Sequence, residues 1–333
     1  AFSTLAFSDQ SAAESVIVVP RVILGIRDDR AWVTQIWQAG EPEPAEIKTL
    51  DEFARFNSAT TKNSPVALID GTIGSAEFEA MAARAIAALE AHDVEKVVLA
   101  RDLVGTVSDD FDLRVALVRL AKRFENCWTY SVDGLFGASP ELLVRVIHSQ
   151  VSARVLAGTA SRGTDPQIDR AIADALATSN KNKREHAFAV ESLVASLKPY
   201  VSEIAADTEP FSLALANLWH LASDVTAALS EEHSSLDLAG ALHPTAAVAG
   251  TPTRDALQLI DQLEQIDRGR YAGPVGWIGA NGDGEWAIAL RGAQLTDSQV
   301  QAFAGCGLVI GSEPSAELAE TELKFQPIRY ALS

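Results

Sequence analysis

Residues 271–295 read YAGPVGWIGANGDGEWAIALRGAQL. This stretch decides the fold, because two apolar runs flank Asn281-Gly-Asp-Gly284, and Asn-Gly and Asp-Gly supply the positive φ that tight hairpin turns require. We therefore predict a long antiparallel hairpin from Tyr271 to Leu295. Side chains alternate along a strand, so one face would be bulky and apolar (Trp286, Ile288, Leu290) and the other would carry Ala287, Ala289 and Arg291.

Arg291 would stand beside two small residues, which leave space in front of its guanidinium group. An arginine in such a place can hold a carboxylate with two parallel hydrogen bonds. The alternative is a surface arginine on the solvated face of an antiparallel strand. The strand pattern alone favours the surface interpretation.

Two features follow the hairpin. Ala304-Gly-Cys-Gly307 predicts a glycine turn or a close approach of the backbone to a ligand. A helix from Glu317 to Lys324 then places acidic residues and one lysine along a single stripe, at Glu313, Glu317, Glu320 and Lys324. Such a stripe is usually solvated, with an ion pair between the last two residues, but it also suits a hard cation that needs oxygen ligands.

Length, composition, net charge and cysteine count exclude several classes of protein. The chain has 333 residues, 47% of them hydrophobic, and a formal net charge of −18. One large or two ordinary domains fit that length, and the negative field disfavours nucleic acid or an anionic membrane as partner. The only cysteines, Cys127 and Cys306, have no zinc or disulfide spacing, and neither a membrane span nor a signal peptide is visible. We expect a cytoplasmic protein.

The rest of the chain predicts alternating strands and helices. The expected strands are residues 15–37, Glu95–Arg101 and an antiparallel meander over Cys127–Val155, with Phe136–Glu141 at a turn and Leu156–Gly163 as a loop. The expected helices are Ser75 to about His92, Asp165 to about Thr178, Ser179–Leu197 and Asp255–Asp267.

Four polar residues in these elements are ambiguous. Lys96 shares a strand face with apolar residues and could act as a buried base, although reaching out to water is the simpler explanation. Glu141 could face a pocket and keep its proton, or accept amide hydrogen bonds from its turn. Glu185 on a helix and His220 in an apolar run are, taken alone, an ordinary helix glutamate and a core histidine.

Many short segments match one known group of enzymes in that group's own order, from about residue 90 to the end. They are Lys96–Arg101, Phe136–Glu141, Leu156–Thr159, Arg162-Gly163, Glu185-His186, Leu218–Leu221, Leu242–Thr245, Gly250–Pro252, Arg268–Trp277, Gly282–Glu285, Ala289–Arg291, Ala304–Gly307 and Glu320–Lys324. These segments resemble the chorismate-utilising enzymes, which include isochorismate, salicylate, anthranilate and aminodeoxychorismate synthases. Residues 1–90 are less specific and resemble a shortened form of the family's variable N-terminal part.

The resemblance implies an α+β fold: a single catalytic domain over residues 1–333, built on a large two-layer antiparallel β-sandwich flanked by helices. It also implies that Glu185 and Glu320 hold Mg²⁺, with Glu317 close by, and that the metal accepts the ring carboxylate of chorismate. Arg291 and Tyr271 would hold the other carboxylate, assisted by the amides of Gly305 and Gly307. The remaining pocket-lining positions would be Gly158, Thr159, His220 and Lys324.

The same resemblance implies a reaction. Lys96 would be the general base for water attacking C2 of chorismate, and Glu141 would protonate the departing C4 hydroxyl, giving isochorismate. The amine must then be neutral and the carboxyl protonated, so burial is expected to lower the pKa of Lys96 and raise that of Glu141. Departures from the family pattern are Cys306, where alanine is frequent, and Thr251, at a variable position.

Other functions remain open on the sequence. A salicylate synthase would also expel pyruvate, but Leu218–Ala222 looks more like the segment in isochorismate synthases. An aminating synthase would need ammonia or a glutaminase subunit, and no obligate glutaminase partner is expected. A non-catalytic interaction module is the third alternative. The residues do not distinguish a menaquinone pathway from a siderophore pathway.

Overall fold

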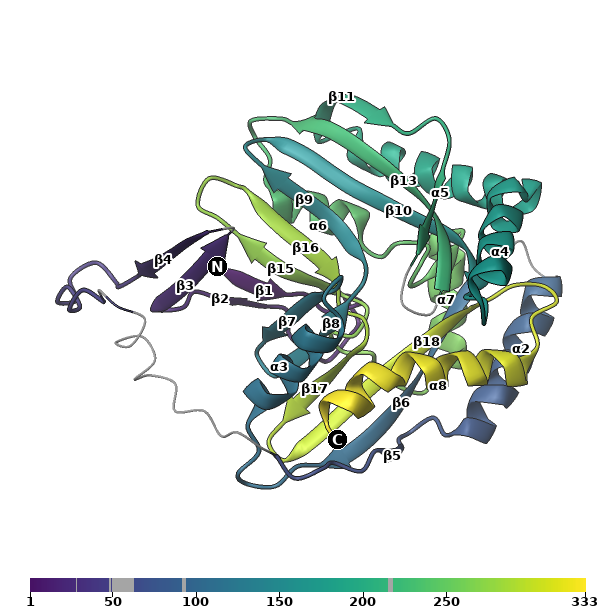
Figure 1. Cartoon of the computed structure of the whole chain (residues 1–333), viewed down its shortest axis with the longest axis horizontal. Coiled ribbons are helices and arrows are strands. Elements are labelled where there is room, and N and C mark those ends of the chain that lie inside the picture. Colours follow the sequence, from purple (N-terminus) through teal and green to yellow (C-terminus); the bar gives the residue numbers. More distant parts are fainter. Residues whose placement is uncertain (28, 48, 50–62, 92–93, 215–217) are drawn as a thin grey trace.

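A computed structural model describes residues 1–27, 29–47, 49, 63–91, 94–214 and 218–333, without the side chains of Thr159, Lys181, Glu185 and Leu218. Two large sheets form the body, and helices flank them (Figure 1). Every strand pairing among the described residues is antiparallel. The predicted α+β architecture is confirmed.

The large sheet has nine strands. In sheet order they are β11 (Val201–Ala206), β13 (Leu218–Leu229), β10 (Gln150–Ser161), β9 (Leu142–Ile147), β16 (Gly284–Ile288), β15 (Pro274–Ile278), β1 (Phe2–Thr4) and β2 (Val16–Val18), with β12 (Phe211–Ala214) beside β13.

The small sheet has seven strands. In order they are β14 (Gly250–Thr251), β6 (Lys96–Thr106), β18 (Gln299–Leu308), β17 (Gly292–Thr296), β8 (Leu135–Ser139) and β7 (Trp128–Val132), with β5 (Ile69–Asp70) beside β6. A separate hairpin, β3 (Val22–Arg27) and β4 (Arg30–Gln35), projects at the left of Figure 1.

Seven described helices cover the sheets: α2 (Ser75–Ala91), α3 (Leu113–Arg123), α4 (Pro166–Thr178), α5 (Asn180–Leu197), α6 (Ser235–Leu242), α7 (Thr253–Leu263) and α8 (Pro314–Ala331). The apolar stripes of these helices pack against the sheets and so form the helix and sheet layers. Val97 and Leu99 of β6 pack in one cluster with α2 and α7, while Val144 and Trp286 of the large sheet pack with α5 and α6. The small-residue face of β16 points the other way, since Ala287 packs against Tyr130 and other residues of the small sheet.

Local signals predicted most elements correctly. The predicted hairpin forms as β15 and β16 over 274–288, and Asp165 and Ser179 are the N-caps of α4 and α5. The predicted end of the hairpin at Leu295 is wrong, because residues 292–296 are β17 of the small sheet. Three further predictions are wrong, because small-residue segments taken for turns or loops are paired strands: most of 136–141 in β8, 156–161 in β10 and 304–307 in β18. Residues 136–139 pair with β7 and β17, residues 156–161 pair with β13 and residues 304–307 pair with β6, and these tertiary partners are not visible in a weak strand pattern.

The chain passes between the sheets at two adjacent points, which we call the seam. One crossing runs from β8 to β9 through Pro140 and Glu141, and the other runs from β16 to β17 through residues 289–291. The crossings are joined by hydrogen bonds: the Ile288 amide donates to the Glu141 carbonyl at 3.0 Å, and the Ser139 hydroxyl donates to the Ile288 carbonyl at 2.6 Å. The predicted meander over 127–155 is therefore wrong in one respect, because it is divided between two sheets at Glu141.

Candidate functional site

Lys96 lies on the face of β6 that is turned away from the helices. Val97 and Leu99 pack against α2 and α7, so Lys96, Val98 and Ala100 face the opposite way. On the neighbouring strand β18, Gly307 pairs with Val98 and Gly305 with Ala100. The lysine side chain lies across Gly307, where an added Cβ would come within 2.7 Å of Lys96 Cε. The glycine therefore leaves the space that the lysine occupies.

Gly307→Ala is expected to displace Lys96 while leaving the fold intact, because the close contact of the added methyl is with the far end of a flexible side chain and its 3.8 Å contact with Val98 is of ordinary length. Misplacing a reacting group by about 1 Å can cost about 100-fold in rate. We expect kcat to fall by about that factor with little change in the thermal midpoint, as measured by steady-state kinetics and calorimetry. Gly240→Ala in α6 is the matched control, because nothing lies within 4 Å of its added Cβ. Equal activities in the two variants would contradict the prediction.

Glu141 is in the seam and partly buried. Burial raises the pKa of its carboxyl, and the positive charges of Lys96, Arg291 and Lys324 oppose that rise. The carboxyl thus has three cations around it, and burial still makes it hold its proton to higher pH than an ordinary glutamate. The expectation that burial raises this pKa agrees with the structure.

Arg291 follows β16 in the second crossing, so its predicted place within the strand is wrong. Its backbone has φ of 52°, a left-handed conformation that is uncommon outside glycine. The Tyr130 hydroxyl supports this segment by donating to the Leu290 carbonyl at 3.0 Å. Burial lowers the pKa of Arg291, and the nearby Tyr271 and Glu141 raise it. The solvated-surface interpretation of this arginine is therefore wrong.

The large sheet contributes a bulge opposite this face. In the β10–β13 pairing, Ala157 faces Leu221 and Thr159 faces His220, which leaves Gly158 as an extra residue with φ of 82°. The His220 ring forms a hydrogen bond with the Gly158 backbone, and burial together with the charge of Arg291 lowers its pKa to about 4. His220 is therefore neutral at pH 7, and its side chain is close to the charges of the seam.

Helix α8 brings its acidic stripe to the small sheet. Lys324 Nζ donates to the Gly305 carbonyl at 2.7 Å and pairs with Glu320 Oε1 at 2.6 Å. The Cys306 thiol forms a hydrogen bond with Glu317, and burial holds the pKa of this thiol well above its usual value. The fully solvated interpretation of the stripe is wrong for these residues.

The oxygen donors on α8 fit a magnesium ion in type. Glu317 and Glu320 lie one turn apart, and Mg²⁺ is usually bound by one or two carboxylates together with water and substrate oxygens. The Glu185 side chain lies outside the described part of the chain. Among the described residues, no group of three or more His, Cys, Asp and Glu side chains is placed to hold a metal. Within the described residues, the candidate carboxylates for a metal site on α8 are therefore those of Glu317 and Glu320.

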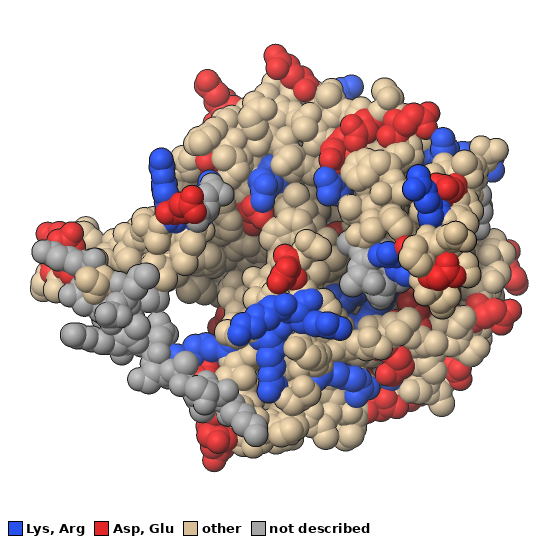
Figure 2. All heavy atoms as spheres, in the orientation of Figure 1, with Lys and Arg blue, Asp and Glu red and all other residues tan. Residues whose placement is uncertain are grey.

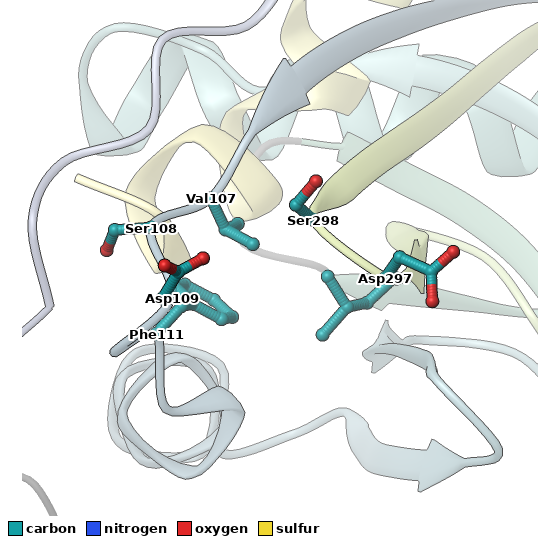
Figure 3. A pocket seen from close by; sticks show the side chains of 7 residues that line it. Val107, Ser108, Asp109, Phe111, Asp297 and Ser298 are labelled. Carbon is teal, nitrogen blue, oxygen red and sulfur yellow. The ribbon is translucent and has the colours of Figure 1, made fainter.

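One cavity lies away from these residues and another reaches Tyr271. One, of about 390 Å³, is at the far end of the small sheet, where Asp109 and Asp297 line it with Val107, Phe111 and other residues (Figure 3). Its only charged lining residues are these two acids, so it disfavours an anionic ligand. The other, of about 540 Å³, includes Tyr271 and Phe303, whose rings stack at 5.2 Å.

The structure thus gathers residues from both sheets and α8 into one network. Its members are Lys96, Glu141, Gly158, His220, Tyr271, Arg291, Gly305, Gly307, Glu317, Glu320 and Lys324. Tyr271 belongs to it because its hydroxyl lies 3.4 Å from the position of a Cβ added at Gly305. The predicted side chains of Thr159 and Glu185 lie outside the described residues, although the Thr159 backbone pairs with His220. Their functional roles stay predictions.

The sequence interpretation missed several buried groups beside the network. Tyr130 supports the Arg291 segment, and Glu264 and Arg268 form a buried ion pair beside β6. The four-residue spacing of that pair is visible in the sequence, but the same spacing is common on solvated helices. Only the tertiary contacts distinguish the two cases.

The chain matches the chorismate-binding enzyme family over residues 2–333. It belongs to that family. This chorismate-binding enzyme is 38% identical over 252 residues to isochorismate synthase EntC from Escherichia coli strain K12, covering 74% of this chain and 64% of that protein. It is 30% identical over 329 residues to isochorismate synthase MenF from Bacillus subtilis strain 168, covering 96% of this chain and 70% of the relative.

A solved structure shows the same fold. MenF, the menaquinone-specific isochorismate synthase from Escherichia coli, superposes with a TM-score of 0.74 at 25% identity, over 85% of this chain and 68% of that chain. The chorismate-binding enzyme therefore spans about two thirds of the length of these relatives. Isochorismate synthases are isomerases, so the predicted family and enzyme class are confirmed.

Proposed function

We propose that this chain is an isochorismate synthase, converting chorismate to isochorismate by adding water at C2 and losing the C4 hydroxyl. The observation that carries the proposal is the meeting of Lys96, Glu141 and Arg291 at the face between the two sheets. Lys96 removes a proton from the attacking water, and Glu141 gives its proton to the departing hydroxyl. One water enters and one leaves, so no other reactant is needed.

Each proton-transfer role has a physical reason. A general acid must hold its proton near neutral pH, and the raised pKa of Glu141 supports this. Lys96 has its stem accommodated by Gly307, which directs its amine along the face shared with Gly305. Lys96 comes from the small sheet and Glu141 from the seam between the sheets, so they can flank the substrate ring from different directions.

The substrate is a dianion, whereas the chain carries a net charge of −18. Figure 2 shows Lys and Arg gathered near the middle of one face, with acidic side chains spread around it. Local cations must therefore attract the substrate against the overall field. In the proposal Arg291 and Tyr271 hold one carboxylate with the amides of Gly305 and Gly307, while Gly158, Thr159, His220 and Lys324 line the pocket.

The second carboxylate requires a further positive charge, because Glu317 and Glu320 lie nearby. We propose that Glu185, Glu320 and Glu317 hold Mg²⁺. The bound ion would supply positive charge and polarise the ring carboxylate. Glu320 lies close to the small sheet, because it forms a 2.6 Å ion pair with Lys324, which in turn contacts Gly305. That lysine remains available as a hydrogen-bond donor to Gly305.

Removing divalent metal is expected to abolish turnover. Purified protein treated with EDTA and then dialysed should form no isochorismate, and added Mg²⁺ should restore the rate. The same samples are followed by circular dichroism, because a loss of fold would also remove activity. Full turnover in metal-free, folded protein would contradict the magnesium proposal while leaving the isomerase proposal intact.

The decisive experiment identifies the product. Incubation with chorismate and Mg²⁺, followed by chromatography, should give isochorismate without added ammonia or partner protein. Salicylate together with pyruvate would instead establish a salicylate synthase. A product formed only with ammonia would establish an aminating synthase, and no turnover under any condition would favour a binding module.

A further inference from the structure

One edge of β6 is paired by two very short strands that leave a gap between them. At one end β14 pairs with residues 96 and 97, and the Val98 amide donates to the Ala249 carbonyl at 2.8 Å. At the other end β5 pairs with residues 103 and 104, and the Gly71 amide just after β5 donates to the Asp102 carbonyl at 3.0 Å. Between them, the Val98 carbonyl and the Ala100 amide point to an edge where no strand is paired within the described residues.

A buried ion pair fills this gap. Glu264 Oε1 accepts from the Ala100 amide at 2.7 Å, and Arg268 Nη2 donates to the Val98 carbonyl at 2.6 Å. The two side chains also bind each other through Arg268 Nε and Glu264 Oε2 at 2.8 Å, and their exposed fractions are only 3% and 2%. Together they satisfy the donor and the acceptor that a neighbouring strand would otherwise satisfy.

The pair is itself held in place from two further sides. Arg268 Nη1 donates to the Val248 carbonyl at 2.8 Å, just before β14. The Phe7 ring lies 4.3 Å from the Arg268 guanidinium carbon, so the cation is covered by an aromatic face. The ion pair therefore connects α7, the segment before β14 and the N-terminal segment to one point on β6.

We propose that Glu264 and Arg268 are positioning residues that fix the register and direction of β6 beside Lys96. This inference rests on the proposed function, because it takes Lys96 as the base. Val98 and Ala100 share the face of Lys96 and pair with Gly307 and Gly305. A shift of the strand at Val98 therefore moves the lysine relative to the glycines and to Glu141. Replacing a buried ion pair with apolar residues is often neutral for stability, so stability alone gives little reason for two buried charges here.

The test compares one variant that keeps the hydrogen bond to the Ala100 amide but is expected to lose stability with another that loses that hydrogen bond. Glu264→Gln keeps an oxygen that accepts from the Ala100 amide but leaves the Arg268 charge buried without its partner. The double variant Glu264→Met with Arg268→Met removes both charges and also removes the acceptor. Arg154→Met is the control, since it breaks an exposed ion pair with Asp224 on the large sheet. Each is measured for kcat, KM, thermal midpoint and amide exchange of residues 96–100.

The positioning role predicts that activity follows the hydrogen bond to Ala100. The double variant should lose about 100-fold in kcat with KM nearly unchanged, and its 96–100 amides should exchange faster, whereas Glu264→Gln should retain more activity despite a lower midpoint. The inference is overturned if the double variant keeps wild-type kcat and exchange, or if kcat falls in the order of the midpoints. If Glu264→Gln does not fold, the double variant alone decides. A wild type that leaves chorismate unchanged defeats the proposed function, and the exchange measurement still decides the positioning role.

Discussion

Lys96→Ala is expected to lower kcat for isochorismate formation by about 10²–10⁴-fold, the range that a positioned general base contributes. The variant removes the amine that lies across Gly307 but leaves Arg291, Tyr271 and the α8 residues unchanged. KM should therefore change much less than kcat, because the groups proposed to hold the carboxylates remain. Steady-state kinetics with chromatographic detection of isochorismate provide the measurement.

Lys122→Ala is the matched control for this variant, because Lys122 is an exposed lysine in the last turn of α3. It should retain the kcat and KM of the wild type. If Lys96→Ala retained most of the wild-type kcat, water would have to be activated by another group and the proposed base would be wrong.

Glu141→Gln is expected to lower kcat by a similar factor of about 10²–10⁴, because an amide has no acidic proton to give to the departing hydroxyl. The wild-type enzyme should also lose kcat as pH rises through the raised pKa of Glu141, since only the protonated carboxyl acts as the acid. The residual rate of the variant should lack that decline. Glu125→Gln, at an exposed glutamate, is the matched control and should show the wild-type pH profile.

The same variant makes a prediction about stability. An unfolded glutamate releases its proton near a pKa of about 4.3, whereas burial keeps Glu141 protonated to higher pH. Between the two pKa values the folded state binds more protons, so the Glu141 contribution lowers the free energy of unfolding as pH rises. Glu141→Gln should therefore gain stability relative to the wild type as pH rises above the unfolded pKa of about 4.3, as measured by denaturant unfolding. A difference that shrinks with rising pH would contradict the burial argument.

Local sequence signals predicted those elements whose geometry is set within a few residues. Asn281-Gly-Asp-Gly284 fixes the β15–β16 hairpin, and Asp165 followed by proline begins α4. Strand β8 and residues 156–161 of β10 were missed because Gly, Ala, Ser and Thr in them have the composition of turns. Their strand conformation comes from neighbours distant in the sequence, which no local pattern contains.

The candidate site was also only partly predictable from the sequence. The resemblance to a known family named its residues, while the residue patterns alone favoured a surface Arg291 and a solvated Lys96. What the patterns could not supply is the seam, where two crossings bring Glu141 and Arg291 together through the hydrogen bond between Ile288 and Glu141. The seam depends on sheet topology, and so does the burial that changes the pKa values of these groups.

The pairing of β6 with β18 also affects how the enzyme is made. Along one edge of β6, residues 97–106 pair with residues 299–308, near the other end of the chain. While the protein is still being translated, Lys96 therefore belongs to a strand that lacks its β18 neighbour until the ribosome has released that later segment. A product truncated before residue 299 would have no partial catalytic centre, so premature termination should abolish activity instead of reducing it by degrees.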